Sequence, residues 1–561
     1  MYRRLSRYSR LLLLALLTLC FCAYLYLVSV SGSSKQAKSP VKPATKLDPN
    51  DANISVGLLL PADLSRQSAI TQAFKNAWRA YEQDAMGSDE YHPISHKGSN
   101  ISLSGGIGYT VVDAIDTMYI MGLSSDYARA RLWINKQLTF DREGTFSTFE
   151  TTIRVLGGLL STYHLTMDDL YLERAIDLAD RILPAFDTHS GLPLPSINLA
   201  KKIGVPDEHS PRTISTAEAS TLQLEFRYLA ELTGNEKYWR KAENAMSVIE
   251  KANPPYNLVP IHMNVHDGTF MSSDIRLGSR GDSYYEYLLK QFLQTARTEP
   301  IYKKLYEGAM QGVHDRLVQK SPTKGATYIS ELLPQGSHNG EITWGRQARQ
   351  DHLVCFLAGS LMLGATTTSS IRNSVSIPPR MDELSPKGQR DWKTGLELLE
   401  TCMYTHETST GLSPEIVQFN TLPNTSTGSD KDWYIKNSRK GGPSGYDARY
   451  MLRPETVESL FIAWRLTGDV RYRDYSWAIF SSIEKYCRLP GGGYATILDV
   501  DTVPVSHDDK QETFFLSETL KYLYLTFANS SVLPLDKYVF NTEAHPLPIF
   551  NPSITPAYPS S

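Results

Sequence analysis

The joins between successive helices in this chain share one pattern, which constrains the fold more than any other feature. Four joins read LSTYHLTMDDLYLERA, LAELTGNEKYWRKA, LKQFLQTARTEPIYKKL and AWRLTGDVRYRDYS, and an aromatic residue opens the second helix at Tyr171, Tyr238, Tyr302 and Tyr472. The first three tyrosines recur about every 65 residues. One helical hairpin cannot bury its apolar face alone, so repeated hairpins pack side by side. We therefore expect an all-α fold, a ring of helical hairpins.

Each of these hairpins also carries an acidic residue at nearly the same point. The acid stands 17 to 21 residues before the tyrosine, and the four acids are Glu150, Glu218, Asp282 and Glu455. A repeat that returns a carboxylate to the same end of successive helices gathers the carboxylates on one rim of the ring. Taken singly, each acid has a plainer explanation, either a first-turn acid favoured by the helix dipole or, for Glu150, an ion pair with Arg154 four residues on.

The N-terminus contains an apolar run, Leu11–Val30, of 20 residues, which is long enough to cross a bilayer as a helix. Four arginines precede the run and the next basic residue is Lys35, so the positive-inside tendency places the N-terminus in the cytosol. A cleaved signal peptide is the alternative, but the run is longer than the usual apolar region of such peptides. We expect a cytosolic tail at 1–10 and a transmembrane signal anchor at 11–30, hence a single-pass type II membrane protein with a lumenal remainder.

Composition divides the rest of the chain. Residues 31–64 are rich in Ser, Lys, Pro and Ala, as in a flexible stem that cannot bury a core. We expect one catalytic barrel over 65–550 and a C-terminal tail at 551–561. The net charge is −3 and no basic cluster follows the N-terminus, so nothing favours nucleic-acid binding.

The cysteines and glycosylation sequons agree with a lumenal location. Two of the five cysteines lie in the apolar run, which leaves Cys355, Cys402 and Cys487. An oxidising compartment permits one disulfide and one free thiol among them. Sequons, which mark a glycosylatable surface, occur at Asn53, Asn100, Asn424 and Asn529.

Helical periodicity extends over most of the expected barrel. Gly- and Pro-rich connections such as LPGGGYATILDVD predict short β-hairpins between the helices, and the polar stretch 366–390 predicts a surface loop. Apolar residues recur at helical spacing over 70–83, 127–138, 148–166, 169–186, 216–233, 236–252, 282–295, 301–318, 351–365, 391–405, 454–467, 470–487 and 512–528.

Two further patterns suit a sugar site. Arg453 and Pro454 precede Glu455, and a proline in the first turn fixes the helix start, so Arg453 stands at the rim beside the acid. Phe514 and Glu518 lie one helical turn apart, and they offer an aromatic plane next to a hydrogen-bond acceptor, although a core phenylalanine beside a satisfied glutamate is equally compatible. Two separated carboxyl groups with a water between them are what an inverting glycosidase needs. The chain has no HExxH, EF-hand, GxSxG or P-loop motif.

Seven strings together resemble one family. They read GGIGYTVVDAIDTMYIMGL, FETTIRVLGGLL, GSRGDSYYEYLLKQF, DHLVCFLAG, LRPETVESL, ETFFLSETLKYLYL and FNTEAHP, in this order across residues 105 to 546. In this respect the chain is similar to the class I α1,2-mannosidases of glycoside hydrolase family 47. The resemblance implies an (αα)7 barrel and a Ca²⁺-dependent, inverting removal of terminal α1,2-linked mannose from high-mannose N-glycans on glycoproteins, by an enzyme that we expect to be monomeric.

The same resemblance assigns roles to residues. Glu150 matches the general acid, acting through a water, Glu455 the general base, and Asp282 a third catalytic carboxylate that is either an acid or a stabiliser. Thr542 in FNTEAHP would offer its hydroxyl and carbonyl to Ca²⁺, a cation that prefers oxygen ligands. Cys355 and Cys402 match a structural disulfide, which leaves Cys487 free. The residues that would line the sugar pocket are Arg154, Glu218, Arg280, His352, Arg453, Glu458, Phe514, Glu518 and Glu543.

Arg280, beside the catalytic aspartate, resembles the endoplasmic reticulum type of this family, whereas the Golgi type usually has leucine there. The resemblance thus implies an endoplasmic reticulum membrane enzyme that trims nine mannoses to eight in glycoprotein quality control. A Golgi trimmer of broader branch specificity and a mannose-binding, lectin-like degradation factor are the alternatives. A lectin of this kind would lack one of the catalytic acids or Thr542, and this sequence has all of them. A helical toroid that processes terpenes would need an aspartate-rich motif, DDxxD or DxDD. The pair Asp168 and Asp169 is too short to match it.

Overall fold

The computed structural model describes residues 59–338, 341–372, 374–423, 431–436 and 445–557. They fall within one compact unit, Ile54–Ser561. The expected cytosolic tail and anchor, the stem as far as residue 58, the sequons at Asn53 and Asn424 and the last residues of the expected C-terminal tail lie outside the described residues. Within the described ranges, no helix is both long and apolar enough to span a membrane.

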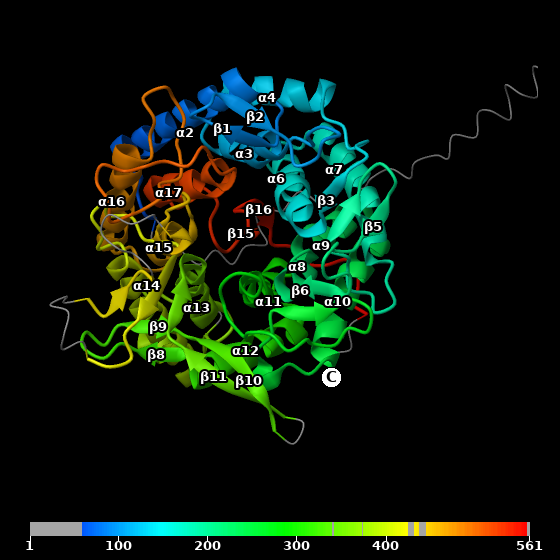
Figure 1. Ribbon diagram of the computed structural model, residues 1–561. Coiled ribbons are helices and arrows are strands. Elements are labelled where there is room, and N and C mark those ends of the chain that lie inside the picture. The colour runs from blue at the N-terminus through cyan, green and yellow to red at the C-terminus, as the bar shows by residue number, and fades with distance from the viewer. Residues whose placement is uncertain (1–58, 339–340, 373, 424–430, 437–444, 558–561) are drawn as a thin grey trace, which may run out of the picture. The chain divides into compact units, whose positions relative to one another are not determined.

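Helices of the described residues form two concentric rings of seven (Figure 1). The inner ring consists of α3 (Tyr109–Ile120), α6 (Gly157–Thr166), α9 (Gln223–Thr233), α11 (Asp282–Gln294), α13 (Phe356–Thr367), α15 (Glu455–Thr467) and α17 (Leu520–Phe527). The outer ring consists of α2 (Leu64–Ala85), α4 (Ser124–Lys136), α7 (Asp169–Ile182), α10 (Glu236–Lys251), α12 (Pro300–Arg316), α14 (Pro386–Tyr404) and α16 (Val470–Tyr486). The ring closes where α17 packs against α2. The predicted (αα)7 toroid is confirmed.

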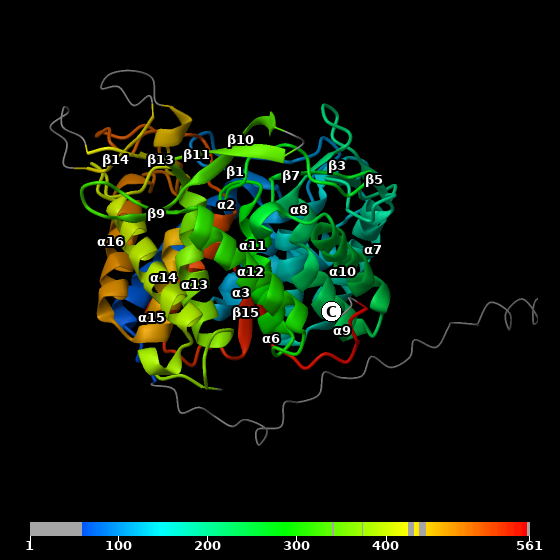
Figure 2. The same ribbon diagram turned by 90° about the horizontal axis from the view of Figure 1, so that it is seen from below.

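The strands are short, and each small sheet of the described residues joins strands that follow one another in the sequence, in antiparallel pairs. Figure 2 shows that most of them lie at one end of the barrel. The pairings are β1 (Glu90–His92) with β2 (Lys97–Ser99); β3 (Thr145–Ser147), β4 (Ser196–Asn198) and β5 (Ile203–Val205); β6 (Thr213–Ser215) with β7 (His262–Asn264); β8 (Val318–Lys320) with β9 (Thr327–Ile329); β10 (Glu331–His338) with β11 (Glu341–Gln347); β12 (Arg349–Asp351), β13 (Ile416–Phe419) and β14 (Trp433–Tyr434); and β15 (Tyr538–Phe540) with β16 (Pro546–Pro548).

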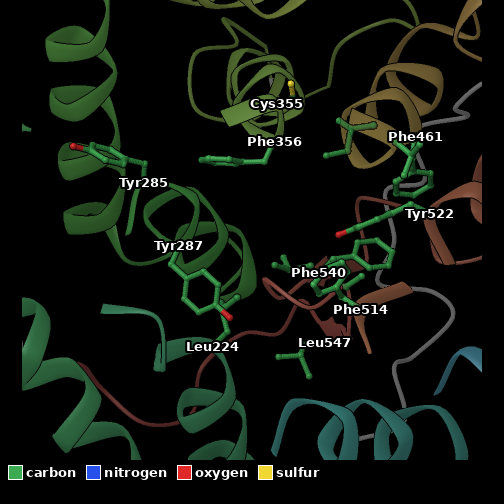
Figure 3. Packing of buried hydrophobic residues seen from close by; sticks show 14 of the residues in the cluster. Leu224, Tyr285, Tyr287, Cys355, Phe356, Phe461, Phe514, Tyr522, Phe540 and Leu547 are labelled. Carbon is green, nitrogen blue, oxygen red and sulfur yellow. The ribbon is translucent and has the colours of Figure 1, made fainter. Parts of the chain in front are cut away.

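The hairpin β15–β16 differs from the others because it occupies the middle of the ring (Figure 1). Phe540 on β15 packs against Phe461 of α15 and Tyr522 of α17, with ring centroids 5.6 and 5.7 Å apart. Figure 3 shows these rings together with Phe514. Aromatic contacts of this kind bury large apolar areas. The hairpin therefore fills the inside of the barrel, and its turn, residues 541–545, is held at a fixed place.

Helix α3 was not among the helices predicted from periodicity. Ten of its 12 residues are buried, including Asp113 and Asp116. Its sequence, YTVVDAIDTMYI, is rich in β-branched residues and its two aspartates are buried, so neither helix propensity nor an exposed polar stripe marks it as a helix. Outer helices such as α7, with one buried face, show a helical period of apolar residues and were predicted.

The barrel extends beyond both of its predicted limits. Leu60 is buried and its N–H donates to Ser530 Oγ at 2.9 Å. At the other end Ile554 is buried and its carbonyl accepts from Arg227 Nη2 at 2.8 Å. Residues 59–64 and 551–557, expected in the stem and the tail, thus pack on the barrel because each segment supplies apolar and backbone partners to it.

Cys355 and Cys402 form a disulfide with their Cα atoms 6.0 Å apart. Cys355 directly precedes the inner helix α13, and Cys402 lies in the last turn of its outer partner α14. The bond therefore ties one inner and one outer helix of the same hairpin. Cys487 is free and buried.

Candidate active site

One cavity of about 310 Å³ brings together residues from most of the length of the chain. The turn of the central hairpin contributes Thr542 and Glu543 to its lining, and we call this part of the cavity its floor. The predicted site residues that line the cavity are Glu150, Arg154, Glu218, Arg280, Asp282, Arg453, Glu455, Phe514, Glu518, Thr542 and Glu543. The structure thus places all three predicted catalytic carboxyl groups around one space.

Two of the acids are positioned by the same local sequence, S-T-x-E. The backbone N–H of Glu150 donates to Ser147 Oγ at 3.2 Å, and that of Glu218 donates to Ser215 Oγ at 3.1 Å. Each serine caps a short helix, α5 (Thr148–Glu150) or α8 (Thr216–Ser220), that follows a strand directly. A serine cap satisfies a free N–H group of the first turn and fixes where the helix begins. The cap therefore sets each glutamate at the rim of the barrel.

The other two acids also begin inner helices. Asp282 is the first residue of α11 and follows Gly281, and Glu455 is the first residue of α15 and follows Pro454. The repeat in the sequence predicted that successive hairpins return an acid to the same end of the ring. The structure has all four acids in the first turn of a helix at that end, and all four line the cavity.

Two inner segments widen into π-helical turns where they meet the cavity. Thr151–Leu156 contains Arg154, and Phe515–Thr519 contains Glu518. A π turn adds a residue to the helical turn, which changes the direction of the side chains, and such turns are frequent at functional sites. Periodicity alone predicted continuous helices here and gave no sign of the irregularity.

Arg154 connects several acids of the site. Its Nε donates to Glu150 Oε2 at 2.7 Å, and its Nη1 donates to Glu543 Oε2 at 2.8 Å and to Asp113 Oδ2 at 3.3 Å. The local ion pair between Glu150 and Arg154 therefore exists, but the same guanidinium also joins the floor of the cavity to helix α3. Its carbon also stands 5.8 Å from the centre of the Phe514 ring, within the range of a cation–π contact.

The cavity carries more negative than positive charge. Burial, with the charges of Glu286 and Asp351, raises the pKa of Asp282 to about 7. Burial also raises the pKa of Glu455 to about 8, although Arg453 opposes the shift, and Glu455 Oε2 has no hydrogen-bond partner. Carboxyl groups whose pKa values are raised in this way are common at catalytic sites.

The oxygen atoms at the floor of the cavity fit a hard cation. The Thr542 hydroxyl donates to Glu286 Oε2 at 2.9 Å, so the lone pairs of its oxygen stay available. Burial and the neighbouring carboxylates raise the pKa of Glu518 and of Glu543, and a cation would relieve this repulsion. In the described part of the chain no group of three or more His, Cys, Asp or Glu side chains could hold a metal ion. The hydroxyl oxygen of Thr542 and the nearby carboxylates are ligands of the type that Ca²⁺ prefers.

Comparisons with known proteins agree with this geometry. Residues 73–549 match the model of the glycosyl hydrolase family 47. This chain belongs to glycosyl hydrolase family 47. It is 42% identical over 495 residues to a mannosyl-oligosaccharide 1,2-alpha-mannosidase of Candida albicans, covering 86% of this chain and 84% of that protein.

Other relatives point the same way. Over 501 residues the chain is 42% identical to an endoplasmic reticulum mannosyl-oligosaccharide 1,2-alpha-mannosidase of Schizosaccharomyces pombe, covering 87% of this chain and 90% of that protein. The solved alpha-1,2-mannosidase from Trichoderma reesei superposes with a TM-score of 0.74 at 27% identity and covers 87% of this chain and 100% of that one.

Two residues predicted to line the pocket of this family 47 protein do not line the cavity. His352 is buried behind Glu455, with its Nε2 3.7 Å from Glu455 Oε2, and burial lowers its pKa well below the usual value. Glu458 lies one turn further along α15, 3.5 Å from Lys290 Nζ, and accepts from Tyr522 OH at 3.4 Å. Both residues support the wall from behind.

Sequence reasoning missed several buried residues that hold the site. The carboxylate of Glu415 accepts hydrogen bonds from Nε and Nη2 of Arg453, at 3.1 and 2.7 Å. The two residues thus form a bidentate ion pair. Asp113, Asp116 and His545 meet beneath the floor. Two aspartates within the apolar stretch GYTVVDAIDTMYI were the available signal, because a charge buried on such a helix needs partners.

Proposed function

We propose that this chain is a calcium-dependent, inverting exo-α1,2-mannosidase that removes terminal α1,2-linked mannose from high-mannose N-glycans and trims nine mannoses to eight. The convergence of Glu150, Asp282 and Glu455 on one cavity carries this proposal. The turn of β15–β16 lies at the floor of the cavity, which favours the end of a glycan over its middle. The names of the relatives at 42% identity support the substrate class.

The proposed roles follow from the surroundings of each acid. Glu455 removes a proton from the attacking water, with the Arg453 charge beside it favouring the ionised form. Glu150, oriented by Arg154, delivers a proton to the departing oxygen through a water, and Asp282, with its pKa of about 7, donates a proton or stabilises the charge that develops. An inverting mechanism needs the acid and the base on opposite faces of the sugar. A bound Ca²⁺ would orient sugar hydroxyls and offset part of the negative charge at Thr542.

We further propose that the protein acts as a monomer in the lumen of the endoplasmic reticulum, anchored by Leu11–Val30 as a type II membrane protein. The length of this apolar run and the four arginines before it support the anchor. The name of the relative from Schizosaccharomyces pombe supports the compartment. Golgi residence is the alternative.

The test uses the full-length chain in detergent with a nine-mannose glycan. We expect one mannose to leave first, as the β-anomer because the reaction inverts, and a single eight-mannose isomer to accumulate. EDTA should stop the release, and added Ca²⁺ should restore it. Rapid trimming below eight would favour the Golgi type, glycan binding without release would favour a lectin, and activity that resists EDTA would exclude the calcium role.

A further inference from the structure

The turn 541–545 reaches the cavity from a part of the chain far from the catalytic acids in sequence, so something must fix it there. Asn541 anchors one side, because its Nδ2 donates to Glu225 Oε1 at 2.7 Å and to the carbonyl of Ile153 at 2.8 Å. Ala544 has a φ of 56°, a left-handed conformation that is costly for a residue with a Cβ atom. Lys521 Nζ donates to the Ala544 carbonyl at 2.7 Å and helps to hold this conformation.

His545 anchors the other side between two carboxylates of helix α3. Its Nε2 lies 3.1 Å from Asp113 Oδ1, and its Nδ1 lies 2.8 Å from Asp116 Oδ2. All three side chains are completely buried. An ionised carboxylate only accepts hydrogen bonds, so both ring nitrogens must donate and the ring is an imidazolium. Lys521 Nζ, at 2.9 Å, is a second cationic partner of Asp116.

These contacts continue into the cavity. Asp113 Oδ2 also accepts from Arg154 Nη1 at 3.3 Å, and the same Nη1 donates to Glu543 Oε2 at 2.8 Å. His545 is therefore connected to a cavity residue in two ways, along its own backbone and through Asp113 and Arg154.

Helix α6 leaves room for the turn. A Cβ atom on Gly157 would lie 2.6 Å from Asn541 Nδ2 and 3.1 Å from His545 Cδ2. Contacts this short force a neighbour to move. The glycine of VLGGLL, a residue type that helices usually avoid, thus allows the turn to pack closely against α6.

We propose that His545 is a positioning residue, which holds the 541–545 turn against α3 so that Thr542 and Glu543 face the cavity and give it its affinity for Ca²⁺. This inference rests on the calcium dependence proposed above. Partners that orient the direct ligands of a metal commonly contribute to its affinity. A role in stability alone would leave the affinity of the folded protein for Ca²⁺ unchanged.

The test is the variant His545→Gln in the full-length chain, stripped of metal with EDTA and titrated with Ca²⁺ alone in a calorimeter. A glutamine amide can donate to one aspartate at a time, so we expect the affinity to fall about 10- to 100-fold. Hydrogen exchange of the metal-free variant should be faster in the peptide that contains 541–545. His314→Gln is the matched control, because His314 Nε2 also pairs with a buried aspartate, Asp391, at 2.9 Å, between the outer helices. It should bind Ca²⁺ like the unmodified chain.

Gly157→Ala is an independent test that removes no charge and also covers the case in which His545→Gln does not fold. Alanine favours the helix, yet its methyl group displaces Asn541 and His545, so we again expect weaker Ca²⁺ binding. Unchanged affinity in the folded variants would overturn the inference while leaving the calcium proposal intact. An unmodified chain that binds no Ca²⁺ would overturn both, and the two failures are therefore distinguishable.

Discussion

Two groups of buried acids lie close together in this barrel, and their pKa values shift in opposite directions. Burial raises the pKa of Glu455 to about 8 and of Asp282 to about 7. Beneath the floor, Asp116 is at least as buried, but the charges of Lys521 and His545 outweigh the effect of burial and lower its pKa to about 2. Burial alone therefore does not determine the protonation state. The number of cationic partners decides whether a buried acid is ionised.

This difference separates two tasks. Asp113 and Asp116, which we call the frame acids, have their charges matched by His545, Lys521 and Arg154, and a fully paired buried network is rigid. The cavity acids lack enough positive charge, and a substrate, a cation or a developing transition state can supply it. At the cavity the chain thus leaves charge unmatched where a ligand is expected to bind.

The largest expected effect comes from Glu455→Gln, which removes a cavity acid. We expect turnover of the nine-mannose glycan to fall by up to about 10⁴-fold, since general base catalysis commonly contributes that much. Binding of 1-deoxymannojirimycin should be largely kept. Stability should not fall, because burial disfavours the ionised form of Glu455 and its Oε2 has no hydrogen-bond partner. Glu397→Gln on outer helix α14 is the control. Full activity in Glu455→Gln would refute the assignment of the base.

Asp116→Asn tests the frame acids, for which we expect a loss of stability. Asp116→Asn leaves Lys521 without its counter-charge and His545 with Asp113 as its remaining carboxylate partner. Removing one partner from a buried ion-paired cluster costs about 3–5 kcal/mol. We expect thermal unfolding of the metal-free chain to show a loss of this size, whereas Glu455→Gln shows none. A similar cost for both variants would mean that the two groups of acids do not differ in the way described.

The contrast between the two groups also explains what the sequence could predict. Glu150, Glu218, Asp282 and Glu455 follow caps or helix starts that recur with the hairpins, so local signals place them. The contact of His545 with Asp113 joins residues more than 400 positions apart, and no local pattern encodes it. Helix α3 was missed because its β-branched residues and its two buried aspartates give no local helical pattern. The π turn at Arg154 likewise depends on packing around the cavity.

The pH dependence of stability should distinguish the two groups as well. Glu455 has a folded pKa raised from 4.5 to about 8, so its contribution is fully present below pH 4.5 and is lost as the pH rises towards 8. Each pH unit between the unfolded and folded pKa values changes the free energy of unfolding by about 1.4 kcal/mol. We therefore expect the metal-free chain to lose about 3–4 kcal/mol of stability between pH 5 and 8. Glu455→Gln should show a flatter profile. Asp116 has a lowered pKa, so its contribution is present above pH 3.8 and disappears as the pH falls to 2.

The smallest expected effect concerns Arg280, at the outer part of the cavity. Its φ is 74° and its Nη1 lies 2.9 Å from His262 Nε2, so the side chain is held over the rim and away from the frame acids. We expect Arg280→Leu to leave the stability and the Ca²⁺ affinity unchanged. It should relax the choice among mannose branches about 10- to 100-fold, because one hydrogen bond to a charged group contributes about 1.5–3 kcal/mol.

The measurement is the isomer distribution of the eight-mannose products, with Arg212→Leu as the control, an exposed arginine that does not line the cavity. A mixture of isomers from Arg280→Leu and one isomer from Arg212→Leu would assign branch choice to the rim. If both variants still yield one isomer, the choice must come from the cavity wall itself, and the unmatched charge there would serve specificity as well as catalysis.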